Sequence, residues 1–157
     1  MDDVASLPAS DMVGPSLHPI DPRMAQLVPI RLATTCREDS KTAIGAAVEE
    51  VIHVFHQRND CGRDSVRVVI FTVTADLRAA KPATSARAAG WSRAQFLCLA
   101  EMPTDDDLAR CIRALIWVER GQSTAPLTPV YLNGTQILRP DLASDALPLP
   151  QPLTFGC

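Results

Sequence analysis

The stretch QFLCLAEMPTDDDLARCIRALIWV, residues 95–118, decides which fold this sequence adopts. Two apolar runs flank a short acidic turn, and each run contains one charged residue, Glu101 in the first and Arg113 in the second. A charge inside a buried strand is costly unless it is paired or meets a charged ligand. The pattern therefore indicates two strands that hold a Glu–Arg pair, either as a structural ion pair or as part of a binding site.

Residues before this stretch predict two strands and one long helix. Alternating apolar residues over 28–34 indicate a strand with Arg31 on one face. Apolar residues at three- and four-residue steps over 40–58 indicate a helix that starts at Asp39 or Ser40. The β-branched run over 66–74 is typical of a strand buried on both faces.

A second, shorter helix is predicted within residues 75–90. Pro82 suits its first turn, and Gly90 suits its C-terminal end. Further along the chain, the pair Asn133-Gly134 predicts either a hairpin turn or a bulge in one continuous strand. The strands expected in this half of the chain span residues 94–101, 111–118 and 130–138.

The predicted order is β-α-β-α-β-β-β, which indicates an α+β or mixed α/β domain with a curved sheet and one long helix. We expect this domain to span residues 27–142. The proline-containing segments 1–26 and 143–157 are expected to be a flexible extension and a mobile tail. A single helix layer leaves one face of a Val- and Ile-rich sheet uncovered, which predicts oligomerisation.

Composition excludes several classes of protein. A net charge of −3 without a basic stripe argues against nucleic-acid binding. No apolar segment is long enough to span a membrane, and the acidic N-terminus is unlike a signal peptide. All basic residues except Lys41 and Lys81 are arginines, whose planar fork grips carboxylates with two parallel hydrogen bonds.

Cysteine and histidine spacing predicts no metal site and no disulfide framework. The five cysteines form no Cys-x-x-Cys pair, so reduced thiols in a cytoplasmic protein are expected. His53 and His56 share a face of the predicted helix, but no third ligand lies nearby in the sequence.

Eight short stretches of the chain form a pattern in their order and spacing. They are IRLATT (30–35), TADLRA (74–79), PATSAR (82–87), GW (90–91), CLAEM (98–102), CIR (111–113), VYL (130–132) and LRPDL (138–142). Together they resemble the small trimeric chorismate mutases of the AroH class. The resemblance covers roughly Val28 to Leu142 and implies the bacillus-type fold, in which a curved mixed sheet forms a pseudo-barrel homotrimer.

The resemblance also implies a reaction and a set of roles. The family converts chorismate to prephenate by a Claisen rearrangement in clefts between adjacent subunits, without metal or cofactor. Arg113 then faces the ether oxygen of the substrate. Glu101 and Cys98 address its ring hydroxyl, and arginines including Arg31 hold its carboxylates. The other residues implied in substrate binding are Lys81, Ala83, Thr84, Arg87, Tyr131, Leu138 and Arg139.

The chain departs from the family pattern at three positions. Lys81 stands where the family usually has an aromatic residue, Thr84 where it often has a lysine, and Leu97 where it often has a threonine. Lys81 is one candidate for the missing positive charge, and an altered cleft mouth is another reading. These departures motivate one alternative, a non-catalytic carboxylate-binding or regulatory trimer. A third reading is a deaminase-like trimer of related architecture, which would act on imine acids.

The proposed chemistry fits the residues. A unimolecular rearrangement needs no nucleophile, so the chain requires no triad. Catalysis instead depends on holding the flexible diacid in its reactive shape and on stabilising negative charge at the ether oxygen. Arg31, Arg87, Arg113 and Arg139 would supply a local positive field in an otherwise slightly acidic chain.

Overall fold

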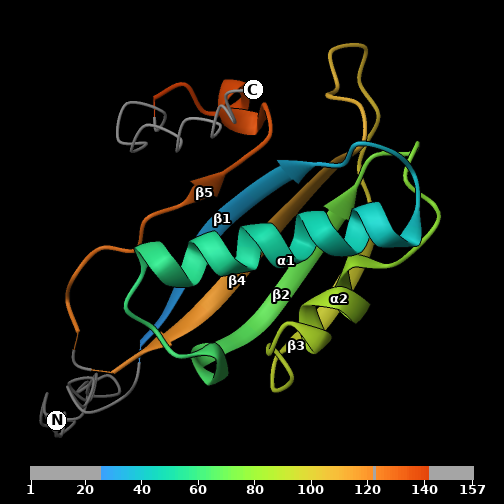
Figure 1. Cartoon of the computed structure of the whole chain (residues 1–157). Coiled ribbons are helices and arrows are strands. Elements are labelled where there is room, and N and C mark those ends of the chain that lie inside the picture. Colours follow the sequence, from blue (N-terminus) through green and yellow to red (C-terminus); the bar gives the residue numbers. More distant parts are fainter. Residues whose placement is uncertain (1–25, 122, 142–157) are drawn as a thin grey trace, which may run out of the picture.

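One long helix lies across one face of a mixed β-sheet in the computed structural model, which describes residues 26–121 and 123–141 (Figure 1). The element order confirms the predicted series and the mixed α/β class. The strands are β1 (Gln26–Thr35), β2 (Val66–Val73), β3 (Gln95–Ala100), β4 (Cys111–Arg120) and β5 (Val130–Tyr131). The helices are α1 (Lys41–Arg58) and α2 (Pro82–Ala88), with 3-10 turns η1 (Arg63–Ser65) and η2 (Thr135–Leu138).

The five strands lie in the order β3-β2-β4-β1-β5, so the strand that carries Arg113 is central. β4 runs antiparallel to both of its neighbours, β1 and β2. The two outer pairs, β1 with β5 and β2 with β3, are parallel. A central strand is held by hydrogen bonds on both edges, which gives Arg113 a rigid backbone.

α1 begins and ends on side-chain caps. Ser40 Oγ accepts a hydrogen bond from the amide of Ala43 at 3.1 Å, which selects Ser40 from the two predicted N-caps. At the other end, buried Asn59 donates to the carbonyls of Phe55 and Thr128 and accepts from the amide of Thr128. The apolar stripe of α1 includes Ile44, Val48, Ile52 and Phe55, which belong to one buried core cluster with residues of β1, β2 and β4.

The two faces of β2 differ in burial, contrary to the prediction. Val69 and Phe71 point toward the core and are buried. Val68, Ile70 and Thr72 point the other way and are only half-buried. The β-branched run therefore predicted the strand correctly, but in a single chain only one of its faces is fully covered.

The predicted strand over 130–138 is wrong beyond Tyr131. Asn133 and Gly134 both have positive φ, 54° and 89°, and they turn the chain out of the sheet without forming a hairpin or a bulge. Thr135, fully buried, then starts η2, and its hydroxyl donates to the carbonyls of Leu132 and Ala33. Two consecutive left-handed residues followed by this hydroxyl bridge favour a 3-10 turn over a continued ladder.

The predicted tail 143–157 lies outside the described residues, as does all of the predicted extension except Gln26. Within the described ranges, no helix has the length and apolar character required to cross a membrane.

Candidate active site

A row of directly paired residues crosses the sheet and carries the candidate site. Arg113 on β4 pairs with Ala33 on β1 and with Thr72 on β2, and Ala33 in turn pairs with Tyr131 on β5. Directly paired residues place their side chains on one face of a sheet. This face is the one opposite the buried side chains of β2, and Arg31 lies on it two residues before Ala33.

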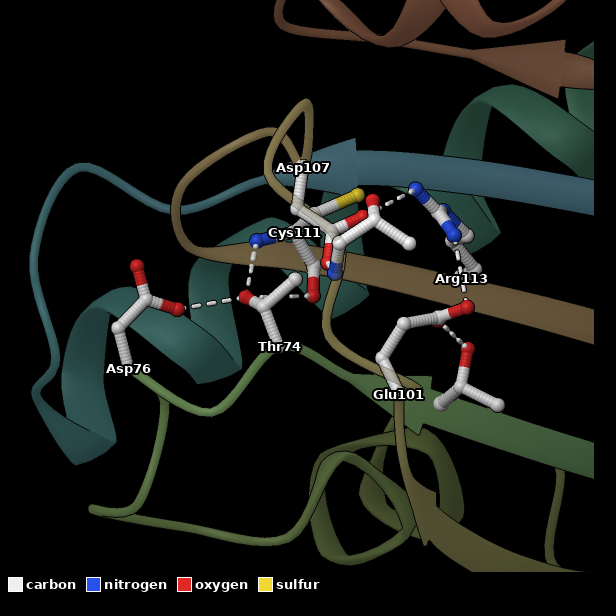
Figure 2. A network of polar contacts seen from close by, with 8 residues as sticks. Thr74, Asp76, Glu101, Asp107, Cys111 and Arg113 are labelled. Carbon is white, nitrogen blue, oxygen red and sulfur yellow. Dashed lines mark hydrogen bonds and ion pairs between the residues drawn. The ribbon is translucent and has the colours of Figure 1, made fainter.

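Arg113 and Glu101 form the ion pair that the sequence predicts. Arg113 Nη1 lies 2.7 Å from Glu101 Oε1, and the two side chains are 21% and 19% exposed. Glu101 follows β3 directly, and its amide donates to the carbonyl of Val73 at 2.8 Å. The hydroxyl of Thr72 donates to the second carboxylate oxygen, Oε2, so both oxygens of Glu101 are held (Figure 2).

A cleft of about 370 Å³ opens beside this pair. Arg113 in its wall has a buried Nε, and Tyr131 in the same row of the sheet has a buried Oη; neither atom has a hydrogen-bond partner among the described residues. A buried donor without a partner is costly, so such atoms mark places where a ligand or water is accommodated. The cleft is lined by Arg31, Ile70, Thr72, Glu101, Arg113, Ala114 and Leu115.

A second polar network fixes the start of β4 and so the position of Arg113. Thr74 Oγ1 donates to Asp76 Oδ1 at 2.6 Å and accepts from the amide of Cys111 at 2.9 Å (Figure 2). Asp76 Oδ2 also accepts from the amide of Arg110, which has a positive φ of 51°. The Thr74 hydroxyl, with a smaller contribution from the Arg110 amide, holds the pKa of Asp76 below its usual value.

The residues predicted around α2 and β3 lie in a different place within one chain. Lys81 and Cys98 line a second hollow, of about 440 Å³. The Arg87 guanidinium lies over the Phe96 ring, 4.6 Å from its centroid. Thr84 is exposed and Ala83 is buried in the core. Cys98 pairs with buried Phe71, so it points to the helix-covered face of the sheet, away from Arg113.

The C-terminal residues form a third group. Arg139 donates two hydrogen bonds to Asp141, at 2.9 and 2.7 Å, and Leu138 is half-buried at the end of η2. These bonds hold the pKa of Arg139 above its ordinary range and that of Asp141 below it. Within a single chain this arginine is therefore engaged by a neighbouring carboxylate.

The structure thus brings three predicted residues, Arg31, Glu101 and Arg113, into one cleft, with Tyr131 in the same row. Two residues were not predicted from the sequence: Thr72, which lines the cleft, and Asp107, which lies beside Arg113 but is not part of the cleft lining. Side chains alternate along a strand, so Thr72 must point to the face of the sheet away from buried Phe71. This alternation is the sequence signal from which Thr72 could have been predicted. Nothing in the acidic run 105–107 singled out Asp107.

No group of three metal-type side chains is found in the described parts of the chain. The expectation of a site without metal or cofactor stays a prediction for the whole protein.

Comparison with known proteins identifies the family of this chain. The family model "chorismate mutase type I" matches residues 27–142. The chain is 37% identical over 116 residues to chorismate mutase AroH of Thermus thermophilus, covering 73% of this chain and 95% of that protein. It is 30% identical over 115 residues to chorismate mutase AroH of Bacillus subtilis, covering 73% and 91%.

A solved structure supports the same assignment. A chorismate mutase from Clostridium thermocellum superposes with a TM-score of 0.63 at 31% identity, covering 70% of this chain and 98% of that one. The matched family model covers all of the elements from β1 to η2 except Gln26, the first residue of β1. This chain therefore belongs to the type I chorismate mutase family.

Proposed function

We propose that this protein is a chorismate mutase whose rearrangement takes place in the cleft beside Arg113. Chorismate becomes prephenate when its ether C–O bond breaks as a new C–C bond forms within the same molecule. No atom enters or leaves, and no proton has to move. The observation that carries the proposal is a guanidinium fixed on a central strand, with one buried N–H unpaired, at the wall of a cleft.

Arg113 is suited to stabilise the charge that develops on the ether oxygen. Glu101 occupies Nη1 at 2.7 Å, which leaves the Nε edge of the guanidinium to donate to a ligand. A donor fixed in advance stabilises developing charge without having to reorganise, and its loss typically slows a reaction by about 10²–10³.

Other side chains on this face are suited to position the substrate. Arg31 lines the cleft and supplies a second guanidinium for a carboxylate. The buried Tyr131 hydroxyl also awaits a hydrogen-bond partner. Glu101, held by Thr72 and Arg113, presents a carboxylate that accepts from the ring hydroxyl. Fixing a flexible diacid in this way supplies the entropic part of the catalysis.

We further propose a homotrimer in which α2 and β3 of one subunit close the cleft of the next. Arg87, Lys81 and Cys98 lie apart from Arg113 in one chain, yet the family resemblance assigns all of them to one site. Leu97 and Leu99, on the edge strand β3, are 52% and 45% exposed, as expected for side chains that a neighbour covers. Leu138 and Arg139 would complete the mouth of the cleft.

Conversion of chorismate tests the activity directly. Purified protein is mixed with chorismate, and the loss of chorismate is followed together with the appearance of prephenate. Enzymatic conversion is expected. Stabilisation by chorismate without its conversion would instead indicate a carboxylate-binding protein. If chorismate is neither converted nor stabilises the protein, the natural ligand is a different molecule.

Mixing two inactive variants tests the shared site. Arg113→Ala and Arg87→Ala are each expected to be inactive, because in each variant every cleft lacks one of the two arginines. If the halves come from different subunits, an equal mixture refolded together has about a quarter of its clefts intact and recovers activity in that proportion. If both arginines serve one site from the same chain, every cleft in the mixture stays damaged, and no activity returns.

A further inference from the structure

A second carboxylate, Asp107, lies beside Arg113 in addition to Glu101. Its Oδ1 is 3.8 Å from Arg113 Nη2, and both side chains are about one-fifth exposed, 22% and 21%. Figure 2 shows Glu101 and Asp107 reaching the guanidinium from different directions. At this distance the two charges attract, but no hydrogen bond forms between them.

Asp107 is held by its own loop. Its Oδ2 accepts a hydrogen bond from the amide of Thr104 at 2.8 Å, and its amide donates to the carbonyl of Thr104 at 3.3 Å. The short turn thus keeps the carboxylate near Arg113 whether or not the two make direct contact. Arg113 Nη2 therefore remains available to an oxygen that approaches more closely than Asp107 does.

The two carboxylates are bound differently. Glu101 has one oxygen on Arg113 at 2.7 Å and the other on the Thr72 hydroxyl, which makes it a fixed part of the cleft wall. Asp107 has one oxygen on loop backbone and the other at 3.8 Å from the guanidinium. A dianionic ligand in the cleft would be repelled by Asp107 and would compete with it for the same cation.

We propose that Asp107 is a positioning residue, a resident counter-ion of Arg113 that lowers the affinity of the cleft for its dianionic substrate. The inference rests on the proposed function of that cleft. In the empty cleft, Asp107 offsets the repulsion between Arg113 and Arg31. When substrate binds, its carboxylate or ether oxygen takes over that role, and the attraction between Asp107 and Arg113 becomes a cost of binding. The effect falls on the ground state and the transition state alike, so it changes KM more than kcat.

The test compares Asp107→Asn with Asp106→Asn in the full chain. An asparagine at 107 keeps an oxygen for the Thr104 amide and removes only the charge. We expect KM for chorismate to fall about fivefold, the scale of a partly exposed ion pair, with kcat within about twofold of wild type. Asp106 is exposed in the same loop, and its variant controls for the change in net charge.

Ionic strength supplies a readout that a purely structural role would not move. At about 1 M salt the screening length is about 3 Å, so the difference in KM between Asp107→Asn and wild type should become smaller, although the partly buried pair is screened less than an exposed one. The inference is overturned if KM for Asp107→Asn is unchanged or higher, if high salt leaves the difference undiminished, or if Asp106→Asn lowers KM equally. A wild-type protein that fails to convert chorismate would instead refute the proposed function, which is a separate outcome.

Discussion

Ala33 on β1 lies directly opposite Arg113 on β4, and its methyl group separates Arg113 from Tyr131 in the row that crosses the sheet. Ala33 is 3% exposed, so the smallest chiral side chain occupies the centre of the charged face. Because this residue is small, no bulky side chain stands between the side chains of Arg113 and Tyr131 in this row. Both atoms are buried without a partner in the described ranges, which is the arrangement expected of a site that waits for a polar ligand.

Removing the Arg113 guanidinium is expected to abolish turnover. Arg113→Ala should lower kcat by about 10²–10³ or more, because it removes a fixed donor from the reacting oxygen. Arg113→Lys should recover only part of the rate, since an ammonium lacks the planar fork that bonds Glu101 and the ligand together. Initial rates of chorismate loss check both variants, with chain association measured beside them.

Arg67→Ala serves as the matched control for that experiment. Arg67 is also a strand arginine paired with a glutamate, Glu119, but its side chain is 42% exposed and outside the cleft. A partly exposed ion pair of this kind contributes little to the free energy of unfolding, about 0–1 kcal/mol. Arg113 has no special role if the Arg113→Ala variant retains a rate similar to that of Arg67→Ala.

The Thr72 hydroxyl is expected to matter through Glu101. Thr72→Val keeps the shape of the side chain but leaves Glu101 Oε2 without its donor, so the carboxylate and its partner Arg113 lose orientation. A net hydrogen bond to a charged group is worth about 1.5–3 kcal/mol, which predicts a drop in kcat of about 10- to 100-fold. Thr72→Ser should restore most of the rate. A wild-type rate in Thr72→Val, with the loss confined to Thr72→Ser, would show that packing of the methyl group, and not the hydrogen bond, is what matters.

Much of the fold was predictable because each element has a strong local signal. The 3.6-residue stripe of α1, the β-branched run of β2 and the apolar run of β4 all appear where expected. The pair Glu101–Arg113 was also predictable, because a charge in an apolar strand requires a partner. The strand prediction was wrong over residues 133–138. Two left-handed residues and the buried Thr135 turn the chain there, although its apolar pattern is typical of a strand.

The candidate site was only partly predictable, because its remaining parts depend on spatial relations that sequence spacing does not contain. Thr72 reaches Glu101 across two parallel strands, 29 residues apart in the chain. Asp107 is one of three consecutive aspartates, and only the path of the loop decides which of them faces Arg113. The expected grouping of Cys98 and Arg87 with Arg113 requires a second subunit, and it stays a prediction.

His56 is expected to make stability depend on pH. Its Nε2 accepts a hydrogen bond from Trp91 Nε1 at 2.9 Å, and its Nδ1 lies 3.0 Å from the carbonyl of Cys61, so the neutral ring satisfies both contacts. Burial lowers the pKa of His56 below 6.5. The folded protein therefore binds this proton less readily than the unfolded chain, and stability is full above about pH 6.5 and falls as the pH drops below it.

The measurement is thermal unfolding between about pH 8 and about pH 5.5 for wild type and His56→Gln. Glutamine can accept from Trp91 but does not titrate, so its Tm should be lower at neutral pH and should fall less on acidification. His53→Gln, on an exposed position of the same helix, is the control and should follow the wild-type curve. Parallel pH curves for wild type and His56→Gln would exclude His56 as the titrating group.

Gly134 is expected to contribute stability through its backbone alone. It has a φ of 89°, yet a methyl group built on it would meet nothing within 4 Å, so Gly134→Ala introduces conformational strain without a clash. We expect the free energy of unfolding to fall by about 1 kcal/mol, because the left-handed backbone conformation is sterically unfavourable for alanine. Gly62→Ala is the matched control, since Gly62 is equally open but has a φ of −69°, which alanine adopts freely. Chemical denaturation should find this control neutral or slightly stabilised, because alanine restricts the unfolded chain. If Gly134→Ala and Gly62→Ala lower the free energy of unfolding equally, the left-handed turn at 133–134 is not what directs the chain out of the sheet and into η2.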